Sequence, residues 1–593
     1  MRAFLVCSLL LTLLWSSAYA ESEVCSIPGH PMADAAGYVL TLGEDYSGVR
    51  EGGLTGMESP YPYQAGWPVD VSETAGPEGA LLVQADGDPE LEVLFSTDLT
   101  VHLMEHDGGY LPGWPVTVTS GNTISGQPSF GDLDGDGVGE VVVASHNYPN
   151  GNTGWTWAYG ADGTLVAGFP LVTGGDHTKS PTVADLEGDG SCEIIVGERD
   201  YPIGRVYVCD GSAELLAGWP QEMDHVPASS AGAADVDGDG VREVFFESYN
   251  SLYGFEADGS VMAGFPFTPS TGDVFSYSAP VFADIDGDGD LEIAVGGHAM
   301  SGLSHMFLLH HDGSVCAGWP KSVSYWIYGP GTFADLDGDD DLEVLAGDQV
   351  LAGSPSNYMH AWHHDGTDVS GWPVGPIDAV NAQAAVADLD GDDAPEVVWD
   401  TNITPGKLMG YNHDGTAMED WPITTDGSTF FNTVAFGDAD VDGDLELLLP
   451  TQLSTPLCTV HMWDIPDSAE VAQLQMPMFQ YGPGRAGEMS DEGQQGVGDG
   501  PAGGRRTVVR AAPNPFSGRV SVSVVGANAP SVLRVYDLGG RVVAELSAAA
   551  SEGGAVFSWD GTSSAGRSMP AGVYAVAVPC GDGVARTLLL KLQ

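Results

Sequence analysis

The sequence predicts an all-β protein, a β-propeller followed by a small immunoglobulin-like β-sandwich, and three observations lead to this prediction. An acidic motif of the pattern D-x-D-G-D-G-x-x-E, flanked by apolar residues, recurs eight times at intervals of 48 to 53 residues. A G-W-P or G-F-P marker, D-W-P in its last copy, recurs with the same period. The 82 glycines and 38 prolines among 593 residues suit many short strands joined by tight turns.

One repeat illustrates the expected blade. We expect four short strands in it, at residues 181–184, 193–196, 205–208 and 214–216. The acidic loop separates the first two strands, and the marker at Trp219 ends the fourth. A single four-stranded sheet cannot bury both of its faces, so successive blades are expected to pack face to face around an axis.

The order of the markers predicts how the ring closes. The first marker, at Trp67, precedes the first acidic loop, whereas the last loop, at Asp438, is followed by a strand at residues 459–463 and by no marker. The segment near residues 61–67 can therefore supply the missing fourth strand of the last blade. This arrangement gives eight blades; seven blades plus an irregular unit is the alternative.

The start of the chain is typical of a secretory signal peptide. Arg2 precedes an apolar run at residues 4–15, and Ala18-Tyr19-Ala20 is a small-residue cleavage site. We expect cleavage near Ala20 and a secreted protein or one on the bacterial outer-membrane surface. Later segments are too short or too polar to span a membrane.

The expected divisions are a signal peptide (1–20), an irregular segment (21–57), the propeller (58–481), a flexible linker (482–506) and the immunoglobulin-like domain (507–593).

The charge balance limits the possible partners. With 18 basic and 84 acidic residues, the net charge is −66. Such a surface repels nucleic acid and anionic membranes, because phosphate binding needs clustered Lys and Arg. It attracts cations instead.

The acidic loops have the spacing of a calcium site. In the loop that starts at Asp132, carboxylates occupy positions 1, 3, 5 and 9, and Gly137 at position 6 permits a sharp turn that aims the carbonyl of position 7 inward. Calcium takes 6–8 oxygen ligands, whereas magnesium prefers tighter octahedra and zinc prefers nitrogen and sulfur. Acidic turns without a metal are the alternative, but carboxylates this close repel one another unless a cation neutralises them.

Seven loops are expected to bind up to seven calcium ions. The first loop is doubtful, because Gln84 replaces the leading aspartate and Pro89 stands at position 6. The expected ligands of the other loops are Asp132, Asp134, Asp136, Val138 and Glu140; Asp185, Glu187, Asp189, Ser191 and Glu193; Asp235, Asp237, Asp239, Val241 and Glu243; Asp284, Asp286, Asp288, Asp290 and Glu292; Asp335, Asp337, Asp339, Asp341 and Glu343; Asp388, Asp390, Asp392, Ala394 and Glu396; and Asp438, Asp440, Asp442, Asp444 and Glu446.

Two family resemblances follow from these motifs. The run from Asp132 to Val143 resembles the FG-GAP or VCBS repeat of integrin-α-like propellers. That resemblance implies stabilising calcium in the loop between the first two strands of a blade, with partners binding elsewhere on the ring. The tail motifs Ala512-Pro513-Asn514-Pro515-Phe516, Val535 to Val543, Trp559-Asp560-Gly561 and Ala571 to Tyr574 resemble the type IX secretion sorting domain and the related FlgD-type immunoglobulin-like domains. This second resemblance implies export and contact with the secretion machinery.

These observations favour a calcium-stabilised surface or secreted module for binding or adhesion, with a protein or glycan ligand. The alternative is a polysaccharide-active hydrolase or lyase that uses the propeller as a scaffold. Motifs of a nucleophile, a phosphate loop or a zinc protease are absent from the sequence, so whether the protein is an enzyme stays open, with a non-enzyme favoured. Aromatic residues outside the repeat markers are the candidate ligand surface: Trp155, Trp157, Tyr325, Trp326 and Tyr328.

Two other sets of side chains have alternative interpretations. Cys192 and Cys209 would lie on one hairpin and could pair, or could be two small buried hydrophobic residues. Histidines precede three Asp-Gly turns, at His310, His311, His363, His364 and His413. Zinc ligands are the alternative, but the histidines are far apart in the sequence and follow the repeat, which favours structural turn residues.

Overall fold

The computed structural model describes residues 59–489 and 508–591 with short gaps. The gaps are residues 75, 77–78, 149, 288, 300–301, 340, 350–355, 393, 402–404, 426, 430–431, 455–456, 467, 469–473, 513–518, 526–531, 538–540, 548, 552–553, 560, 564–566, 568, 571 and 581–582. The expected signal peptide lies outside the described residues. The chain divides into two compact units, residues 1–500 and 501–593, which are described separately.

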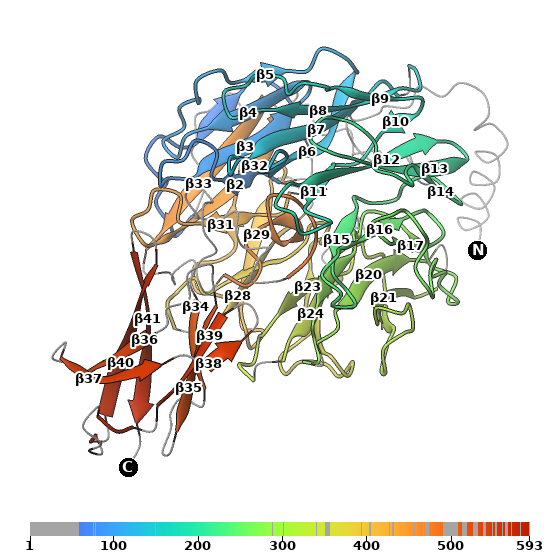
Figure 1. The fold of residues 1–593 in the computed structure, drawn as a ribbon. Coiled ribbons are helices and arrows are strands. Elements are labelled where there is room, and N and C mark those ends of the chain that lie inside the picture. The colour runs from blue at the N-terminus through green and yellow to red at the C-terminus, as the bar shows by residue number, and fades with distance from the viewer. Residues whose placement is uncertain are drawn as a thin grey trace. The chain divides into compact units, whose positions relative to one another are not determined.

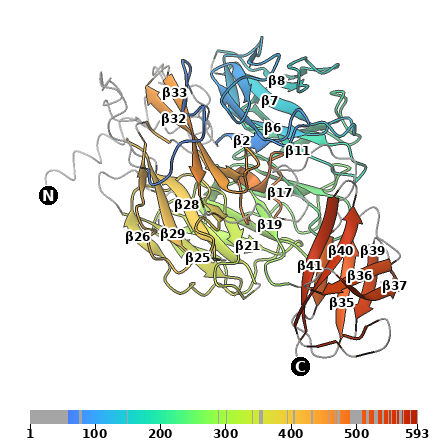
Figure 2. The same cartoon turned by 90° about the vertical axis from the view of Figure 1, so that its left-hand side faces the viewer.

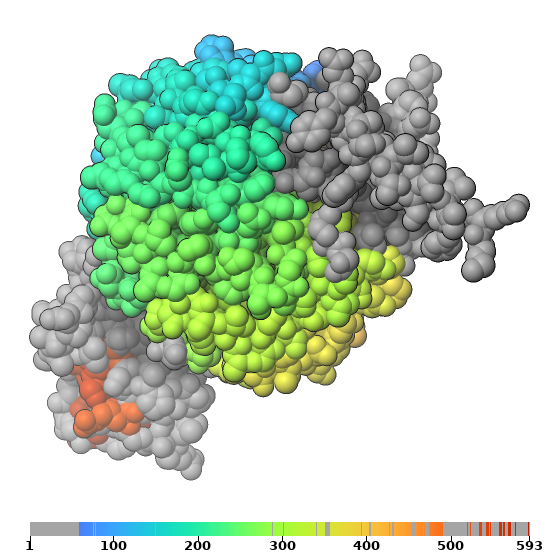
Figure 3. Space-filling view, turned by 90° about the vertical axis from the view of Figure 1, so that its right-hand side faces the viewer, coloured from blue at the N-terminus to red at the C-terminus, as the bar shows by residue number. Residues whose placement is uncertain are grey.

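The first unit is an eight-bladed β-propeller, which confirms the predicted fold and blade number. The colour in Figure 1 passes from blue at the first blade to orange at the last, and Figures 1 and 2 both show the orange β32 and β33 beside the blue strands. Successive colours form adjacent bands in the space-filling view (Figure 3), as expected when consecutive blades are neighbours.

The strands of the first four blades, from the inside of the ring outward, are as follows. Blade 1 contains β2 (Leu81–Val83), β3 (Glu92–Thr97), β4 (Thr100–Met104) and β5 (Val116–Thr117). Blade 2 contains β6 (Thr123–Gly131), β7 (Glu140–His146), β8 (Gly154–Tyr159) and β9 (Leu171–Thr173). Blade 3 contains β10 (Asp176–His177), β11 (Thr182–Ala184), β12 (Glu193–Asp200), β13 (Ile203–Cys209) and β14 (Gln221–Met223). Blade 4 contains β15 (Gly232–Ala234), β16 (Glu243–Glu247) and β17 (Leu252–Phe255).

The other four blades repeat this order. Blade 5 contains β18 (Val274–Phe275), β19 (Val281–Ala283), β20 (Glu292–His298), β21 (Ser304–Leu309) and β22 (Lys321–Val323). Blade 6 contains β23 (Thr332–Ala334), β24 (Glu343–Gly347), β25 (Asn357–His363) and β26 (Val374–Ile377). Blade 7 contains β27 (Ala385–Ala387), β28 (Glu396–Thr401), β29 (Lys407–Asn412) and β30 (Ile423–Thr424). Blade 8 contains β31 (Ala435–Gly437), β32 (Leu445–Ser454), β33 (Leu457–Ile465) and β1 (Val69–Val71).

Both ends of the propeller chain meet in blade 8. Strand β1 pairs antiparallel with β33, with Val69 opposite Val460, and Tyr63 forms a single bridge with Trp463. The predicted closure is therefore confirmed, but the outer strand begins after the marker instead of ending at it. Strand β14 likewise begins after Pro220, while Leu215 makes only an isolated bridge. Proline has no N–H to donate, so the ladder resumes at the following residue.

The marker tryptophans join neighbouring blades. The indole N–H of Trp219 donates to the carbonyl of Ala257 at 2.9 Å, and Trp319 and Trp372 make the same bond to the next blade. The marker glycine allows this close approach: Gly218 has φ +96°, and a Cβ there would lie 1.9 Å from the carbonyl oxygen of Asp258. This contact confirms blade-to-blade packing as the role of the marker.

A segment that follows blade 8 contacts the inner strands of the whole ring. Residues 474–489, which include a short 3-10 turn at Phe479–Tyr481, bond to the backbone of all eight blades or of the segments entering them. Because the inner strands surround the axis, a segment that contacts them all fills the centre of the ring. Residues 482–489 fall inside the expected linker and belong to this central segment; residues 490–507 lie outside the described residues.

The second unit is the predicted sandwich. One sheet contains β34 (Val508–Ala512), β35 (Val520–Val525), β39 (Gly554–Trp559) and β38 (Ala549–Ser551) in that order. The other contains β37 (Val542–Ser547), β36 (Val532–Asp537), β40 (Gly572–Cys580) and β41 (Gly583–Lys591). Its core includes buried Val522, Phe557, Trp559 and Val576.

Replacing Arg485 by Met should destabilise the propeller. The buried guanidinium donates to the carbonyl of Pro128 in β6 of blade 2 (3.0 Å) and to that of Gly79 in the segment entering blade 1 (3.2 Å). Removing it leaves buried acceptors, each of which costs about 1–3 kcal/mol, so we expect a loss of about 2–4 kcal/mol in urea unfolding. The control is Lys407→Met, which removes a half-exposed ion pair to Asp378 and should cost less than about 1 kcal/mol. Equal losses in the two variants would contradict the role of the central segment.

Candidate metal centres

The acidic loops all lie at one end of the blades. Each joins the innermost strand of the repeat to the next strand, as residues 185–192 join β11 to β12, and the glutamate at position 9 starts or lies at the start of that second strand. Because the topology repeats, the eight loops form a circle around one face of the ring. We call this the acidic-loop face.

The backbone shapes each loop around its leading aspartate. In blade 2, Asp132 accepts hydrogen bonds from the N–H groups of Gly135 (2.8 Å) and Gly137 (2.7 Å). Asp185 accepts both equivalent bonds, from Gly188 and Gly190. Asp235 accepts the one from position 6, and Asp388 the one from position 4. Gly135 and Gly137 have φ +74° and +88°, so the turn needs left-handed residues at position 4 as well as at the expected position 6.

The glutamate at position 9 anchors the loop to the core. In blade 2, one oxygen of Glu140 accepts the N–H of Leu133, the buried apolar residue at position 2, at 2.9 Å. The equivalent bond is made in each of the other seven loops, by Glu92, Glu193, Glu243, Glu292, Glu343, Glu396 and Glu446. The carboxylate is therefore held beside the loop aspartates instead of turning into solvent.

Burial changes the acidity of these glutamates. It raises the pKa of Glu140 and Glu193 to about 7, and that of Glu243 and Glu396 to about 8. The negative charges of the loop aspartates raise these pKa values further, while the backbone hydrogen bond opposes the shift. Without a cation, these groups hold protons near neutral pH.

The structure brings several of the predicted ligands together. Ligand atoms within 4.8 Å of one another occur in the groups Asp132, Asp134 and Glu140; Asp235, Asp237 and Asp239; and Asp337, Glu343 and His363. At position 7, the N–H groups of Val138, Ser191, Val241 and Ala394 donate to the position-5 aspartates. Asp288 lies outside the described residues. These clustered oxygens fit calcium, and calcium binding itself stays a prediction.

The doubtful first loop keeps part of this geometry. The side-chain oxygen of Gln84 accepts the N–H of Gly87 at 2.7 Å, which is the bond that the leading aspartate accepts in blade 2. Asp86 and Asp88 lie with Glu105 in a further group of potential ligands. Glu105 follows β4, across from Glu92, and the sequence analysis missed it because it lies outside the acidic motif.

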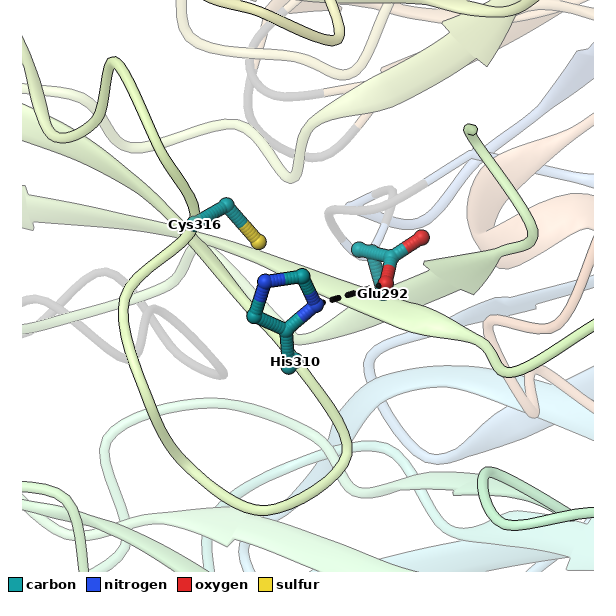
Figure 4. A group of neighbouring side chains, drawn as sticks. All are labelled: Glu292, His310 and Cys316. Atoms are coloured by element: carbon teal, nitrogen blue, oxygen red, sulfur yellow. Dashed lines mark hydrogen bonds and ion pairs between the residues drawn. The ribbon is translucent and has the colours of Figure 1, made fainter. Parts of the chain in front are cut away.

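Two of the histidines before the turns form hydrogen bonds with buried glutamates. His310 Nδ1 bonds to Glu292 and His363 Nδ1 to Glu343, both at 3.0 Å (Figure 4 shows the first pair). Each histidine lies across the ladder from its glutamate, at the end of β21 or β25. The prediction that His310 and His363 are structural residues beside the turns is therefore confirmed, and the structure adds a glutamate partner for each of the two.

The opposite ends of the blades present aromatic rings. Tyr201, His225, Tyr249, His298 and Trp326 form a chain of neighbouring rings, with successive centroids 5.9, 5.1, 6.3 and 5.1 Å apart. We call this chain the aromatic band. It spans blades 3 to 5 and the connection into blade 6, at the hairpins and connections far from the acidic loops.

Some candidates from the sequence lie elsewhere. Trp157 is 4% exposed and packs in the core, where its indole N–H bonds to Ser145, so its assignment to a ligand surface was wrong. Tyr328 is buried beside Trp326 at the inner side of the band. Cys192 and Cys209 are both free, which favours the interpretation as small buried residues.

Comparisons with known proteins support this description of both units. A model of the FG-GAP-like repeat matches residues 83–143, 132–196 and 229–295, and a model of the FlgD Ig-like domain matches residues 514–582. The chain carries FG-GAP-like repeats and a FlgD Ig-like domain. Rhamnogalacturonan exolyase YesX of Bacillus subtilis is 33% identical over 114 residues, which are 17% of this chain and 18% of that protein.

Solved structures give a general likeness only. The biofilm matrix protein Bap1 of V. cholerae has a TM-score of 0.46 and 13% identity, covering 70% of this chain and 92% of that one. PorZ, a surface component of the type-IX secretion system of Porphyromonas gingivalis, has a TM-score of 0.29 and 15% identity, covering 86% and 75%. In the part of the chain that the structure describes, no helix has the length and apolarity to cross a membrane.

Replacing Val441 by Gly should stabilise the propeller. Val441 stands at position 4 of the blade 8 loop with φ +60°, a conformation that costs a β-branched residue about 1–2 kcal/mol. The side chain is 51% exposed, so little packing is lost. We expect a gain of about 0.5–1 kcal/mol in chemical unfolding with calcium present. The reverse change, Gly135→Val in the blade 2 loop, should destabilise the propeller. If Val441→Gly leaves the stability unchanged or lowers it, the backbone of Val441 is not strained.

Removing divalent cations should make stability fall as the pH rises. The pKa of Glu140, Glu193, Glu243 and Glu396 is about 7 to 8 in the metal-free fold and near 4.5 when unfolded, so the fold binds more protons between these values. The stability they contribute is full below about pH 4.5 and is lost as the pH passes about 8. In chelator, the melting temperature should therefore fall from pH 5.5 to 8. Saturating calcium should raise it and flatten this dependence; a curve unaffected by calcium would contradict the metal sites.

Proposed function

We propose that this protein is an exported binding module whose propeller is stabilised by calcium. The observation that supports this most directly is the circle of loops on the acidic-loop face. Each has a position-9 glutamate, half-buried in blade 2 and buried in the other blades, beside further carboxylates of the loop. Bound cations would neutralise charges that otherwise repel one another in a chain of net charge −66. Calcium suits the donor set, because carboxylate and carbonyl oxygens predominate.

Two features support export to the cell surface. The first twenty residues have the charged, apolar and small-residue regions of a signal peptide. The C-terminal unit is a FlgD Ig-like domain, and its motifs are similar to those of type IX sorting domains. We therefore propose that this domain guides the chain across the outer membrane.

We propose that the ligand is a glycan and that it contacts the aromatic band. Aromatic rings offer flat apolar surfaces on which the C–H faces of sugars stack, and the flanking histidines and tyrosines supply hydrogen-bonding groups. Tyr201 is 66% exposed, and Tyr249 and Trp326 are partly exposed. The band lies away from the acidic loops, so the metal sites stabilise the fold while this face binds.

A polysaccharide-active enzyme is the second candidate. The similarity of one stretch to a rhamnogalacturonan exolyase favours it, although the match spans less than a fifth of either chain. Such an enzyme would bind a glycan and cleave it, whereas a binding module would leave it intact. Turnover therefore separates the two candidates.

A glycan array probed with the mature, calcium-saturated chain tests the proposal. We expect glycan binding without cleavage, and Trp326→Ala and Tyr249→Ala should each weaken it about 3- to 10-fold, since an aromatic stacking contact is worth about 0.5–1.5 kcal/mol. The control is Tyr110→Ala, an exposed tyrosine on the acidic-loop side that should leave binding unchanged. Binding equal in all variants would rule out the aromatic band, and release of shortened glycan would favour the enzyme.

A further inference from the structure

Three side chains of different chemistry meet beside the acidic loop of blade 5. The Glu292 carboxylate, a ring nitrogen of His310 and the Cys316 sulfur lie within 4.8 Å of one another. In Figure 4 the imidazole lies between the sulfur and the carboxylate. Glu292 and Cys316 are buried, whereas 39% of the His310 side chain is exposed, so an ion from solvent can reach the cluster.

The backbone fixes the positions of these residues. Glu292 is the first residue of β20, and His310 follows β21, directly across the ladder from it. After the turn, the chain runs beside β21 again, and the N–H of Cys316 donates to the carbonyl of Leu308 at 3.0 Å. The three donors are therefore held by a hairpin and its turn, which limits the loss of conformational entropy when they bind an ion.

Cysteine at this position is particular to blade 5. The residues that make the same backbone bond in the other blades are Leu111, Val166, Leu216, Met262, Val369 and Met418, which are apolar, and Gln64 in blade 8. Blade 6 repeats the glutamate–histidine pair as Glu343 and His363 but has Val369 in place of the cysteine. At these three repeat positions, blade 5 alone has a carboxylate, an imidazole and a thiol.

We propose that blade 5 holds a Zn²⁺ ion ligated by Cys316, His310 and Glu292, with water as the fourth ligand. Zinc takes tetrahedral sites of sulfur, nitrogen and oxygen, whereas calcium requires six or more oxygens and does not favour thiolate. Three protein ligands and an open fourth position suit zinc, and the exposed edge of His310 leaves room for the water.

Binding of the ion releases a proton. In the metal-free cluster, Glu292 Oε2 accepts the N–H of Ile285 at 3.3 Å, while its Oε1 faces His310 Nδ1 at 3.0 Å. On binding, the Cys316 S–H bond breaks, an S–Zn bond forms, and the proton leaves to solvent. The imidazole stays neutral, with its proton on the nitrogen that does not bind the metal, and no electron is transferred.

Cobalt(II) is the probe for this site, because it replaces zinc and reports thiolate ligation by its absorption. The mature chain is titrated with Co²⁺ in saturating calcium and a non-chelating reductant, so that the calcium loops of the other blades stay filled. In the blade 5 loop, Glu292 is then a ligand of the transition metal instead of calcium. We expect one equivalent of Co²⁺ to produce the visible bands of tetrahedral cobalt and a thiolate charge-transfer band, and one equivalent of Zn²⁺ to abolish both.

Two matched variants exchange the distinguishing residue between blades. Cys316→Val places in blade 5 the residue of blade 6 and should abolish the cobalt bands without lowering the melting temperature in calcium. Val369→Cys completes the triad with Glu343 and His363 and should double the signal. A folded wild-type chain without the charge-transfer band, or Cys316→Val with an unchanged one, would overturn the zinc site. Either outcome leaves the proposed function standing, because calcium and glycan binding are measured separately.

Discussion

The hydrogen bond between the position-9 glutamate and the amide of position 2 is the contact on which the acidic-loop face depends. It ties the start of the second strand to an apolar residue in the core, as Glu140 does to Leu133. The same bond draws a carboxylate out of water and places it against three aspartates. Such a loop holds its carboxylates close together, so a bound cation would relieve their repulsion and strengthen the link between the two inner strands.

Closure of the ring combines three independent contacts. Strand β1 completes blade 8 and so joins the two ends of the propeller. Five of the marker tryptophans bond to the neighbouring blade, as Trp219 does to Ala257. Residues 474–489 join the inner strands at the axis, where Arg485 bonds to two different blades. Because these contacts are spread over the ring, opening one blade interface must break bonds at both its inner and outer edges.

The sequence predicted the features that repeat and missed those that occur once. Blade number, loop positions and the closing strand follow from a period of about 50 residues, and the buried residues at position 2 follow from their apolar character. Residues 474–489 have no period, because each of their contacts is made with a different blade. Trp157 was misplaced because alternation along β8 does not show which face of a strand is covered by the next blade.

Variation at a single repeat position explains how equivalent blades acquire different chemistry. The residue across the ladder from the position-9 glutamate is Glu105, Gly160, Asp210, Glu256, His310, His363, Asn412 or Asp464 in successive blades. The strands and the loop backbone stay the same, so this residue changes the charge and the donor type beside each loop without changing the fold. A carboxylate there adds negative charge, glycine adds none, and histidine with a nearby cysteine replaces hard oxygen by softer donors. The ring therefore presents a series of related but unequal candidate cation sites on one face.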